Sequence, residues 1–319
     1  MHNTSTHGHT WVVGIVGLVV AALLFAAFPS WPALASVALY AAVFHIAVGT
    51  LALFSVYLVA PSRLKRLIPK HETAARPGYD FGWSFGWMNG YWIAGVIFVA
   101  LAVLLSIQFL SSAWQLLPIV LVLLAVNLFA GNYVWRTSMK LDFITLPFVD
   151  LLSSDHDLVL DAGCGSGRTT LALSRVIKNG RIVGLDRFDA DYIQGGGKTL
   201  IERNLKTAGV LEKVTLVKGD ITQLEFEDNK FDAAVSTYMM DHLGDGKLPA
   251  LKEVYRTLKP GGKFLLVVFE PNLFLFAVAN LMYLGMASRK VWRGLFEQAK
   301  LTLLQEGSIN GGVYFLVQK

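Results

Sequence analysis

The sequence predicts a two-part chain, in which a helical membrane domain of four spans precedes a doubly wound α/β domain. Two observations predict this fold class. Charged side chains are absent from residues 1–62 and again from residues 91–135. From Asp157 onward, short apolar runs alternate with amphipathic stretches, which is the pattern of a sheet with crossover helices. We place the transmembrane domain at residues 1–140 and the α/β domain at residues 141–319.

The predicted spans lie near residues 11–28, 33–60, 91–110 and 114–135. The first has 18 residues, or about 27 Å as a helix, which is close to the thickness of a bilayer core. The basic residues that follow the second and fourth spans are Arg63, Lys65, Arg66, Lys70, Arg76, Arg136 and Lys140. Because positive residues mark the cytoplasmic side, we expect an integral membrane protein whose α/β domain and both termini are cytoplasmic.

Two features of the predicted membrane domain admit other interpretations. Residues 11–35 resemble a cleavable signal peptide, but no Lys or Arg precedes them, so a span is favoured. His45 and Asn127 are polar groups inside spans, where such groups are functional candidates. An interhelical hydrogen bond is favoured over a substrate role for both.

Charge and cysteine content exclude several classes of function. The net charge of +5 divides into +3 for residues 1–150 and +2 for the remainder. The α/β domain is therefore almost neutral, and no nucleic-acid partner is expected. Cys164 is the only cysteine of the 319 residues, which excludes an internal disulfide and a multi-cysteine metal centre. No metal site is predicted.

A glycine-rich turn follows the first predicted strand, Leu158–Leu160, and precedes a helix over Thr169–Ile177. The turn reads DAGCGSG over residues 161–167. Glycines at alternate positions let the backbone turn tightly and let a ligand approach it, and the helix that follows presents free N–H groups. Alone, this loop predicts a nucleotide site, and a NAD site would fit nearly as well.

The rest of the α/β domain continues the alternation. The predicted elements are strands Arg181–Leu185, Val214–Val217, Phe231–Ser236 and Phe264–Phe269 and a helix over Leu248–Leu258, which the turn KPGGK joins to the last strand. Asp186 follows the second strand, where a carboxylate can accept hydrogen bonds from a ribose diol. Quoted in order, LDAGCGSGRTT, IVGLD, KGDI, FDAAVSTYMMDHL and LKPGGK resemble the class I S-adenosylmethionine-dependent methyltransferases.

The resemblance runs from about Asp157 to Lys319. It implies a Rossmann-like fold of seven strands, with S-adenosylmethionine as cofactor and the last antiparallel pair within LTLLQEGSINGGVYFLVQK. It also implies that Gly163, Gly165 and Gly167 pass close to the methionine and ribose portions of the cofactor, with Asp161 nearby.

Four further residues receive cofactor-binding roles from the resemblance. Asp186 would bind the ribose hydroxyls, and Ser236 would face the methyl donor. Asp220 would contact the adenine amino group, and Ile221 would contact the ring through its backbone. Purely structural roles stay open, because Asp161 or Asp220 could serve only as a helix cap.

Three polar residues after the fourth strand are the catalytic candidates. Tyr238, Asp241 and His242 should lie on the carboxyl edge of the sheet, where doubly wound folds bind ligands. Methyl transfer needs mainly alignment and exclusion of water, but a phenol, hydroxyl or protonated amine acceptor also needs a base. We expect Asp241 or His242 to be that base and Tyr238 to orient the acceptor. A packing role for His242 stays open.

The predicted spans favour a lipid or lipophilic acceptor taken from the cytoplasmic leaflet, so that the bilayer is a partner. An amino headgroup and a ring carbon or oxygen are both compatible with the residues. Residues 272–287 are apolar on nearly all sides and predict either a membrane-dipping helix or a buried one. The alternatives are a small diffusible acceptor such as a thiol, with the spans as anchor, and a membrane protein that senses the cofactor without catalysis. The oligomeric state is left open.

An aromatic stretch, GYDFGWSFGWMNGYW, occupies residues 78–92. Aromatic residues alternate with small or polar ones from Tyr79 to Trp87, which is a strand-like period. The stretch follows the basic loop and precedes the third predicted span. We hypothesise that it forms one wall of a portal between the bilayer and the active site, and a simple interfacial anchor is the alternative.

Overall fold

The computed structural model describes part of the chain. The described residues are 78–83, 85–108, 116–139, 144, 146–147, 149–190, 193–272, 275, 285–309 and 312–319. The predicted spans at residues 11–28 and 33–60, with His45, lie outside the described residues, and so does most of the apolar segment 272–287. The predictions made for them stay predictions.

The chain divides into two compact units. The first comprises Met1–Pro69, Phe85–Met139 and Leu273–Leu281. The second comprises Lys70–Ser84, Lys140–Asn272 and Met282–Lys319. The described part of the first unit is therefore an insertion in the sequence of the second, because residues 78–83 belong to the second unit and the helices that follow them do not.

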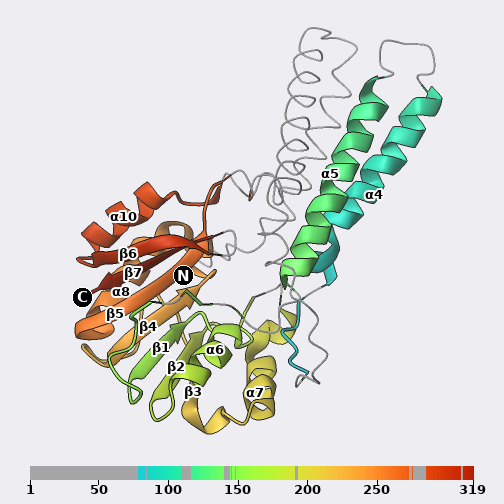
Figure 1. Cartoon of the computed structure of the whole chain (residues 1–319). Coiled ribbons are helices and arrows are strands. Elements are labelled where there is room, and N and C mark those ends of the chain that lie inside the picture. The colour runs from blue at the N-terminus through green and yellow to red at the C-terminus, as the bar shows by residue number, and fades with distance from the viewer. Residues whose placement is uncertain are drawn as a thin grey trace. The chain divides into compact units, whose positions relative to one another are not determined.

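The described part of the first unit contains two long helices that lie side by side, α4 at Phe85–Gln108 and α5 at Leu116–Met139 (Figure 1). Helices were predicted here as the spans 91–110 and 114–135. Gly95 makes close packing possible, because an added Cβ atom would lie 2.7 Å from the Phe129 ring. Small residues at such crossings are typical of apolar helix pairs.

One described helix is long and apolar enough to cross a membrane. It covers Met88–Ile107, within α4, with a mean hydropathy of 2.3. The apolar part of α5, Leu117–Tyr133, is shorter. The described residues therefore do not establish four spans. Among them, α4 is the one helix with the length and composition of a span. Asn127 is buried in this unit.

The second unit is built on a seven-stranded sheet in the order β3-β2-β1-β4-β5-β7-β6 (Figure 1). The strands are β1 Leu158–Ala162, β2 Arg181–Asp186, β3 Val214–Lys218, β4 Phe231–Thr237, β5 Leu258–Phe269, β6 Thr302–Ile309 and β7 Gly312–Gln318. The first five pair in parallel, and β7 pairs antiparallel with β5 and β6. The predicted Rossmann-like sheet with a final antiparallel pair is confirmed.

Helices cover both faces of this sheet. They are α6 Arg168–Val176, α7 Lys198–Thr207, α8 Lys247–Thr257 and α10 Arg289–Gln298, with short 3₁₀ turns η3 Gln194–Gly197, η4 Leu211–Lys213 and η5 Met240–Gly246. On one face, Leu251 of α8 and Trp292 of α10 are fully buried in the main core. On the other face, Leu173 of α6 packs over β1 and β4, and Ile201 of α7 packs beside Cys164. Cys164 therefore has a packing role.

The KPGGK segment was predicted as a turn before the last strand, but the structure places it within that strand, β5. β5 already begins at Leu258, which pairs with Phe231, and the pairing resumes at Lys263 opposite Ala233. The residues between form a bulge, at which Gly261 has a φ of 78°. A bulge keeps the strand continuous while its extra residues leave the ladder, which a local turn signal does not distinguish from a loop.

The aromatic stretch does not continue as one extended segment. It is extended only to Trp83, which forms an antiparallel bridge with Ile193, and α4 begins at Phe85. Phe81 is buried between α6 and α7, in contact with a cluster of the second unit. Phe81 therefore does not present its ring to a bilayer, whereas Tyr79 and Trp83 are only partly buried, and the portal and anchor hypotheses for the stretch stay predictions.

Candidate active site

The glycine loop joins β1 to α6 and is held by the end of β2. The backbone N–H groups of Gly163 and Cys164 donate to the Leu185 carbonyl, at 2.8 and 3.1 Å. Gly163, Gly165 and Gly167 have φ values of 82°, 50° and 96°, a region that favours glycine. A Cβ atom on Gly167 would lie 2.7 Å from the Ile201 side chain. The loop is thus a tight cradle that side chains would fill.

Asp161 is the last residue but one of β1, just before this cradle, and it is fully buried. Its Oδ2 atom accepts a hydrogen bond of 2.6 Å from the Thr170 hydroxyl in α6, and its Oδ1 atom has no partner in the described part of the chain. Burial raises the pKa of this carboxyl to about 7. A buried acceptor without a partner is uncommon and calls for a ligand or a water.

Asp186 stands at the end of β2 and ties two loops together. Its Oδ2 atom accepts from the Gly165 N–H at 2.9 Å, and its Oδ1 atom accepts from the Phe188 N–H at 2.7 Å. Burial raises its pKa. Each carboxylate oxygen can accept a second hydrogen bond, so the predicted contact with ribose hydroxyls is compatible with these bonds.

Asp220 and Ile221 follow β3. The Oδ1 atom of Asp220 accepts from both the N–H and the hydroxyl of Thr222, each at 2.8 Å, so it does cap a turn. Its Oδ2 atom lies 3.9 Å from the Arg187 guanidinium. Ile221 is buried in the main core, which leaves its backbone as the part that a ligand could reach. The predicted adenine contacts stay predictions.

The end of β4 carries Ser236, Thr237 and Tyr238. Ser236 is fully buried and its hydroxyl has no partner among the described residues. The Thr237 hydroxyl lies 2.6 Å from the Thr169 hydroxyl, which joins β4 to the start of α6. Tyr238 has a φ of 55°, and its ring lies 4.7 Å from the Phe269 ring. A left-handed aromatic residue stores strain of order 1 kcal/mol, and such strain clusters at functional sites.

Asp241 and His242 lie in η5, directly after β4. Asp241 is buried, and its Oδ2 atom accepts from the Phe269 N–H at 3.0 Å. Its Oδ1 atom has no partner in the described ranges, and burial raises its pKa to about 7. His242 is half-buried and donates its backbone N–H to Met239. Asp241 thus has an oxygen that could accept a proton, and the choice between Asp241 and His242 as the base stays a prediction.

A family model described as a methyltransferase domain matches residues 159–262. This range begins in β1 and ends in the bulge of β5, so it contains the glycine loop and the ends of the first four strands. The chain contains a methyltransferase domain. The enzyme class and the cofactor predicted from the sequence, S-adenosylmethionine, are confirmed at the level of this domain.

Curated relatives share this domain. A demethylmenaquinone methyltransferase of Staphylococcus aureus (strain MRSA252) is 37% identical over 126 residues, which are 39% of this chain and 48% of the relative. The proteins of other Staphylococcus aureus strains, such as strain JH9, match equally well. The chain therefore spans about half the length of the curated relatives that it matches.

Solved structures of similar domains are more distant in sequence. An S-adenosylmethionine-dependent methyltransferase of Methanosarcina mazei is 21% identical, with a TM-score of 0.44 over 55% of this chain and 98% of that one. A geranyl diphosphate C-methyltransferase of Streptomyces coelicolor A3(2) is 13% identical, with a TM-score of 0.43 over 52% of this chain and 74% of that one.

Arg168 and Asn204 belong to the methyltransferase domain's candidate site, although the sequence did not single them out. Arg168 is the first residue of α6, directly after the glycine loop, and its guanidinium carbon lies 5.8 Å from the centre of the Phe81 ring and 5.7 Å from that of Trp83. The Asn204 amide donates to the Ser166 carbonyl in the loop at 3.0 Å. The position of Arg168 after the last glycine was the available signal.

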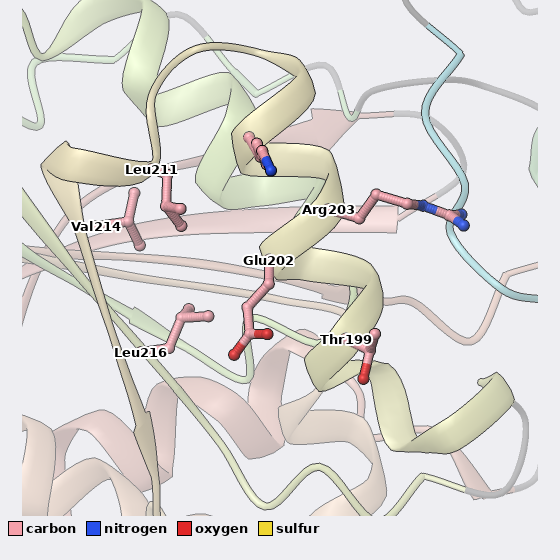
Figure 2. Close-up of a pocket in the computed structure, with 7 residues that line it drawn as sticks. Thr199, Glu202, Arg203, Leu211, Val214 and Leu216 are labelled. Atoms are coloured by element: carbon pink, nitrogen blue, oxygen red, sulfur yellow. The ribbon is translucent and has the colours of Figure 1, made fainter.

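A separate open hollow of about 580 Å³ lies beside α7 and β3 (Figure 2). Its lining residues are Thr199, Glu202, Arg203, Lys206, Leu211, Val214 and Leu216. None of the predicted site residues lines it. Arg203 extends from it toward residues 78–83 and pairs with Asp80 (Figure 2). The chemistry-bearing groups of the methyltransferase domain are therefore at the carboxyl ends of the strands and not in this hollow.

Proposed function

We propose that the protein is a membrane-bound methyltransferase that transfers a methyl group from S-adenosylmethionine to a lipophilic acceptor at the cytoplasmic face. The observation that carries this proposal is the presence, in one chain, of the methyltransferase domain and of Met88–Ile107, a helix apolar enough to cross a membrane. A catalytic domain fused to such a helix works on a surface, where a lipophilic acceptor is concentrated. The bilayer is then both anchor and source of substrate.

The relatives support the acceptor class. These relatives are named demethylmenaquinone methyltransferases, and they are 37% identical to this chain over 126 residues. By analogy, we propose for this chain an acceptor of similar chemistry, with a hydroxylated ring that receives the methyl group on carbon or oxygen. A phospholipid amino group is the second possibility within the same class of acceptor.

The chain's own residues supply a cradle for the cofactor. When bound, S-adenosylmethionine supplies a methyl group on a positively charged sulfur. The glycine loop offers backbone N–H groups and a close approach, and Asp186 holds that loop through Gly165. The Oδ1 atom of Asp161, which is buried and has no partner among the described residues, suits a positively charged ligand group. These residues bind and orient, which is most of what methyl transfer requires.

Asp241 is the proposed base. A ring carbon or hydroxyl that gains a methyl cation must release a proton, and the free Oδ1 atom of Asp241 is positioned to accept it at the end of β4. A pKa of about 7 matches a base that works near neutral pH. The Tyr238 ring lies 4.7 Å from the ring of Phe269, whose backbone N–H bonds to Asp241, and Tyr238 would orient the acceptor.

The decisive experiment uses the full chain in detergent or nanodiscs with S-adenosylmethionine labelled in the methyl group. The protein is incubated with a total membrane lipid extract and, separately, with an aqueous extract of the same cells. We expect label in organic-soluble product only, and ring methylation is then located by mass spectrometry. Label confined to water-soluble product would support a small diffusible acceptor, and cofactor binding without any labelled product would support a sensor.

A further inference from the structure

A network of ion pairs lies beside the carboxyl end of β5, among residues that have no part in the proposed cofactor cradle. Arg289, the first residue of α10, donates from its Nε and Nη2 atoms to the two carboxylate oxygens of Glu270, at 2.6 and 2.8 Å. The same guanidinium donates to the Ser308 hydroxyl of β6 at 2.7 Å and lies 3.5 Å from Glu306. Two parallel bonds fix both the distance and the orientation of a carboxylate. The pair therefore joins α10 and β6 to the residue that follows β5.

The α10 side of this ion pair is firmly anchored. Trp292 and Phe296 of the helix are buried in the main core, where the rings of Phe296 and Phe315 lie 5.2 Å apart. Ser288 caps the helix, since its hydroxyl accepts from the Val291 N–H. The two side chains of the pair are 27% and 21% exposed, so solvent and salt screen it less than they screen a fully exposed pair.

The other side of the ion pair is next to the proposed base. Glu270 directly follows Phe269, whose N–H donates to the Asp241 Oδ2 atom at 3.0 Å and whose ring lies 4.7 Å from the Tyr238 ring. The pairing of β5 with β7 ends at Phe269, and the ends of an element open more readily than its centre. Shortly beyond, Leu273–Leu281 belongs to the first unit. The position of the Phe269 N–H therefore depends on what holds the residue after it.

We propose that the Arg289–Glu270 ion pair positions the proposed base, Asp241, by holding the end of β5 against it. Both members of the pair are positioning residues, which act through the Phe269 N–H. This inference rests on the proposed function, because it takes Asp241 as the group that accepts a proton from the acceptor. It adds that two residues 19 positions apart, outside the cofactor cradle, set the proton affinity of that base.

The direction of the expected pH effect follows from the groups around Asp241. Burial raises its pKa to about 7, while the hydrogen bond from Phe269 and the charge of Lys247 in α8 lower it. Tyr238, at the end of β4, is a further titratable group that interacts with it, and His242 is its neighbour in η5. Loosening the Phe269 bond removes an interaction that favours the ionised carboxylate, so the pKa of Asp241 should rise. The base would then be protonated at a pH at which the wild-type base is not.

The first measurement is hydrogen–deuterium exchange of the full chain in detergent, read by mass spectrometry on overlapping peptides that cover Phe269. Arg289→Gln removes the ion pair, and exchange of the Phe269 amide should become roughly 3- to 10-fold faster. Arg293→Gln is the matched control, because Arg293 lies on the same helix and bonds to Glu306 at 2.9 and 2.5 Å. It should leave exchange at Phe269 unchanged.

The second measurement is turnover as a function of pH, with labelled S-adenosylmethionine and the lipid extract. In Arg289→Gln the rise of turnover with pH should be centred about 0.5 to 1 unit higher than in wild type. Turnover should then be roughly 3- to 10-fold lower at about pH 6 and within about twofold of wild type at about pH 9. The KM for S-adenosylmethionine should not change. Arg293→Gln should keep the wild-type profile.

Two further variants test the same contact from its other side. Glu270→Gln removes the charge of the partner and should shift the profile in the same direction, which also serves if Arg289→Gln does not fold. The double variant should shift no further than the larger single one, because either change breaks the same pair. Arg289→Lys keeps the charge but not the two parallel bonds, and it should lie between wild type and Arg289→Gln.

The outcomes separate this inference from the proposed function. Wild-type exchange at Phe269 in Arg289→Gln, or equal effects of Arg289→Gln and Arg293→Gln, overturns the inference and leaves the methyltransferase in place. Loss of turnover by one factor at every pH would indicate a general loss of stability and also overturns it. A wild-type profile without a rise near neutral pH removes Asp241 as the base, and the inference with it. Absence of any labelled product from wild type overturns the proposed function itself, whereas the exchange measurement tests the contact without turnover.

Discussion

The two compact units differ in what they expose and in what they bury. In the described part of the first unit, large apolar side chains such as Leu104 and Ile107 are 61% and 67% exposed, whereas Asn127 and Asn132 are buried. The second unit buries its aromatic and aliphatic side chains, with Trp292 fully enclosed. The described helices of the first unit therefore expose apolar side chains of the kind that the second unit buries, which is what the proposed membrane location requires.

In the second unit, the buried side-chain oxygens that have no hydrogen-bond partner among the described residues lie in one part of the sheet. Among its described residues, the buried side-chain oxygens without a hydrogen-bond partner belong to Asp161, Ser236 and Asp241. All three lie at the carboxyl ends of β1 and β4, the neighbouring strands between which the strand order reverses. Unsatisfied groups destabilise a fold unless a ligand uses them, so their clustering indicates the place of function.

The largest expected effect concerns this cluster. Asp241→Asn keeps the shape and the hydrogen bond to Phe269 but removes the proton acceptor, so turnover should fall roughly 100- to 10,000-fold while cofactor affinity stays within about threefold. Wild-type turnover should rise with pH through about 7, as Asp241 loses its proton, and the variant should lack this rise. Initial rates with labelled cofactor measure both.

Two control variants test whether Asp241 is the base and whether catalysis belongs to the second unit alone. His242→Ala should reduce turnover far less than Asp241→Asn, and an equal loss would return His242 to the role of base. Asn132→Leu, in the first unit, should leave turnover nearly unchanged. A loss as large as that of Asp241→Asn would break the assignment of catalysis to the second unit alone.

The second effect is on stability. Burial raises the pKa of Asp161 from 3.8 to about 7, so the folded state binds its proton more tightly than the unfolded state does. The free energy of unfolding without cofactor should therefore fall as pH rises from about 4 to 7, by up to roughly 4 kcal/mol. Asp161→Asn should remove much of this slope and raise Tm at pH 8. A wild-type Tm that does not change across this pH range contradicts the prediction.

The third expected effect tests whether the exposed face of α4 in the first unit lies in a membrane. Leu104→Lys places a charge on the exposed face of α4 and should cost about 3 kcal/mol of insertion free energy, seen as a smaller carbonate-resistant membrane fraction. Val176→Lys is the matched control, because Val176 is 57% exposed at the end of α6 in the second unit. The control should leave the fraction unchanged. Equal behaviour of the two variants would remove the difference between the units.

The smallest expected effect concerns two glycines of the second unit. It distinguishes the cost of a strained backbone conformation from the cost of a steric clash. Gly167 and Gly209 both have positive φ, 96° and 68°, but an added Cβ meets Ile201 at the first and nothing within 4 Å at the second. Gly209→Ala should destabilise by about 1 kcal/mol, and Gly167→Ala by about 2 kcal/mol with weaker cofactor binding. Chemical unfolding and calorimetry check this. Equal losses would mean that the loop has room for a side chain.

Most of the second unit could be predicted because its signals are local. The strands around Leu160 and Val235 are continuous apolar runs, which buried parallel strands require. The glycines of the loop adopt positive φ values that other residues rarely adopt, so their spacing in the sequence was enough to predict the turn. Asp241 was predicted as a catalytic candidate from its position after β4, but only its burial separates it from His242 as the base.

What could not be predicted depends on contacts between distant segments. Asp80 and Asn204 are 124 residues apart, and no local pattern joins them. The alternation of aromatic residues from Tyr79 to Trp87 predicts a strand, but the extended part ends at Trp83 and α4 begins at Phe85.

The contact between residues 79–83 and α7 has a consequence for synthesis. On the ribosome, Phe81 emerges long before Ile201 and Leu205, the α7 residues against which it packs. Between them the ribosome makes all of α4 and α5. The second unit can close around Phe81 only after this helical pair is finished, and closing so long a loop has an entropic cost of several kcal/mol. Pairing of α4 with α5 before that step shortens the loop that remains to be closed, so formation of the helical pair lowers the entropic cost of folding the second unit.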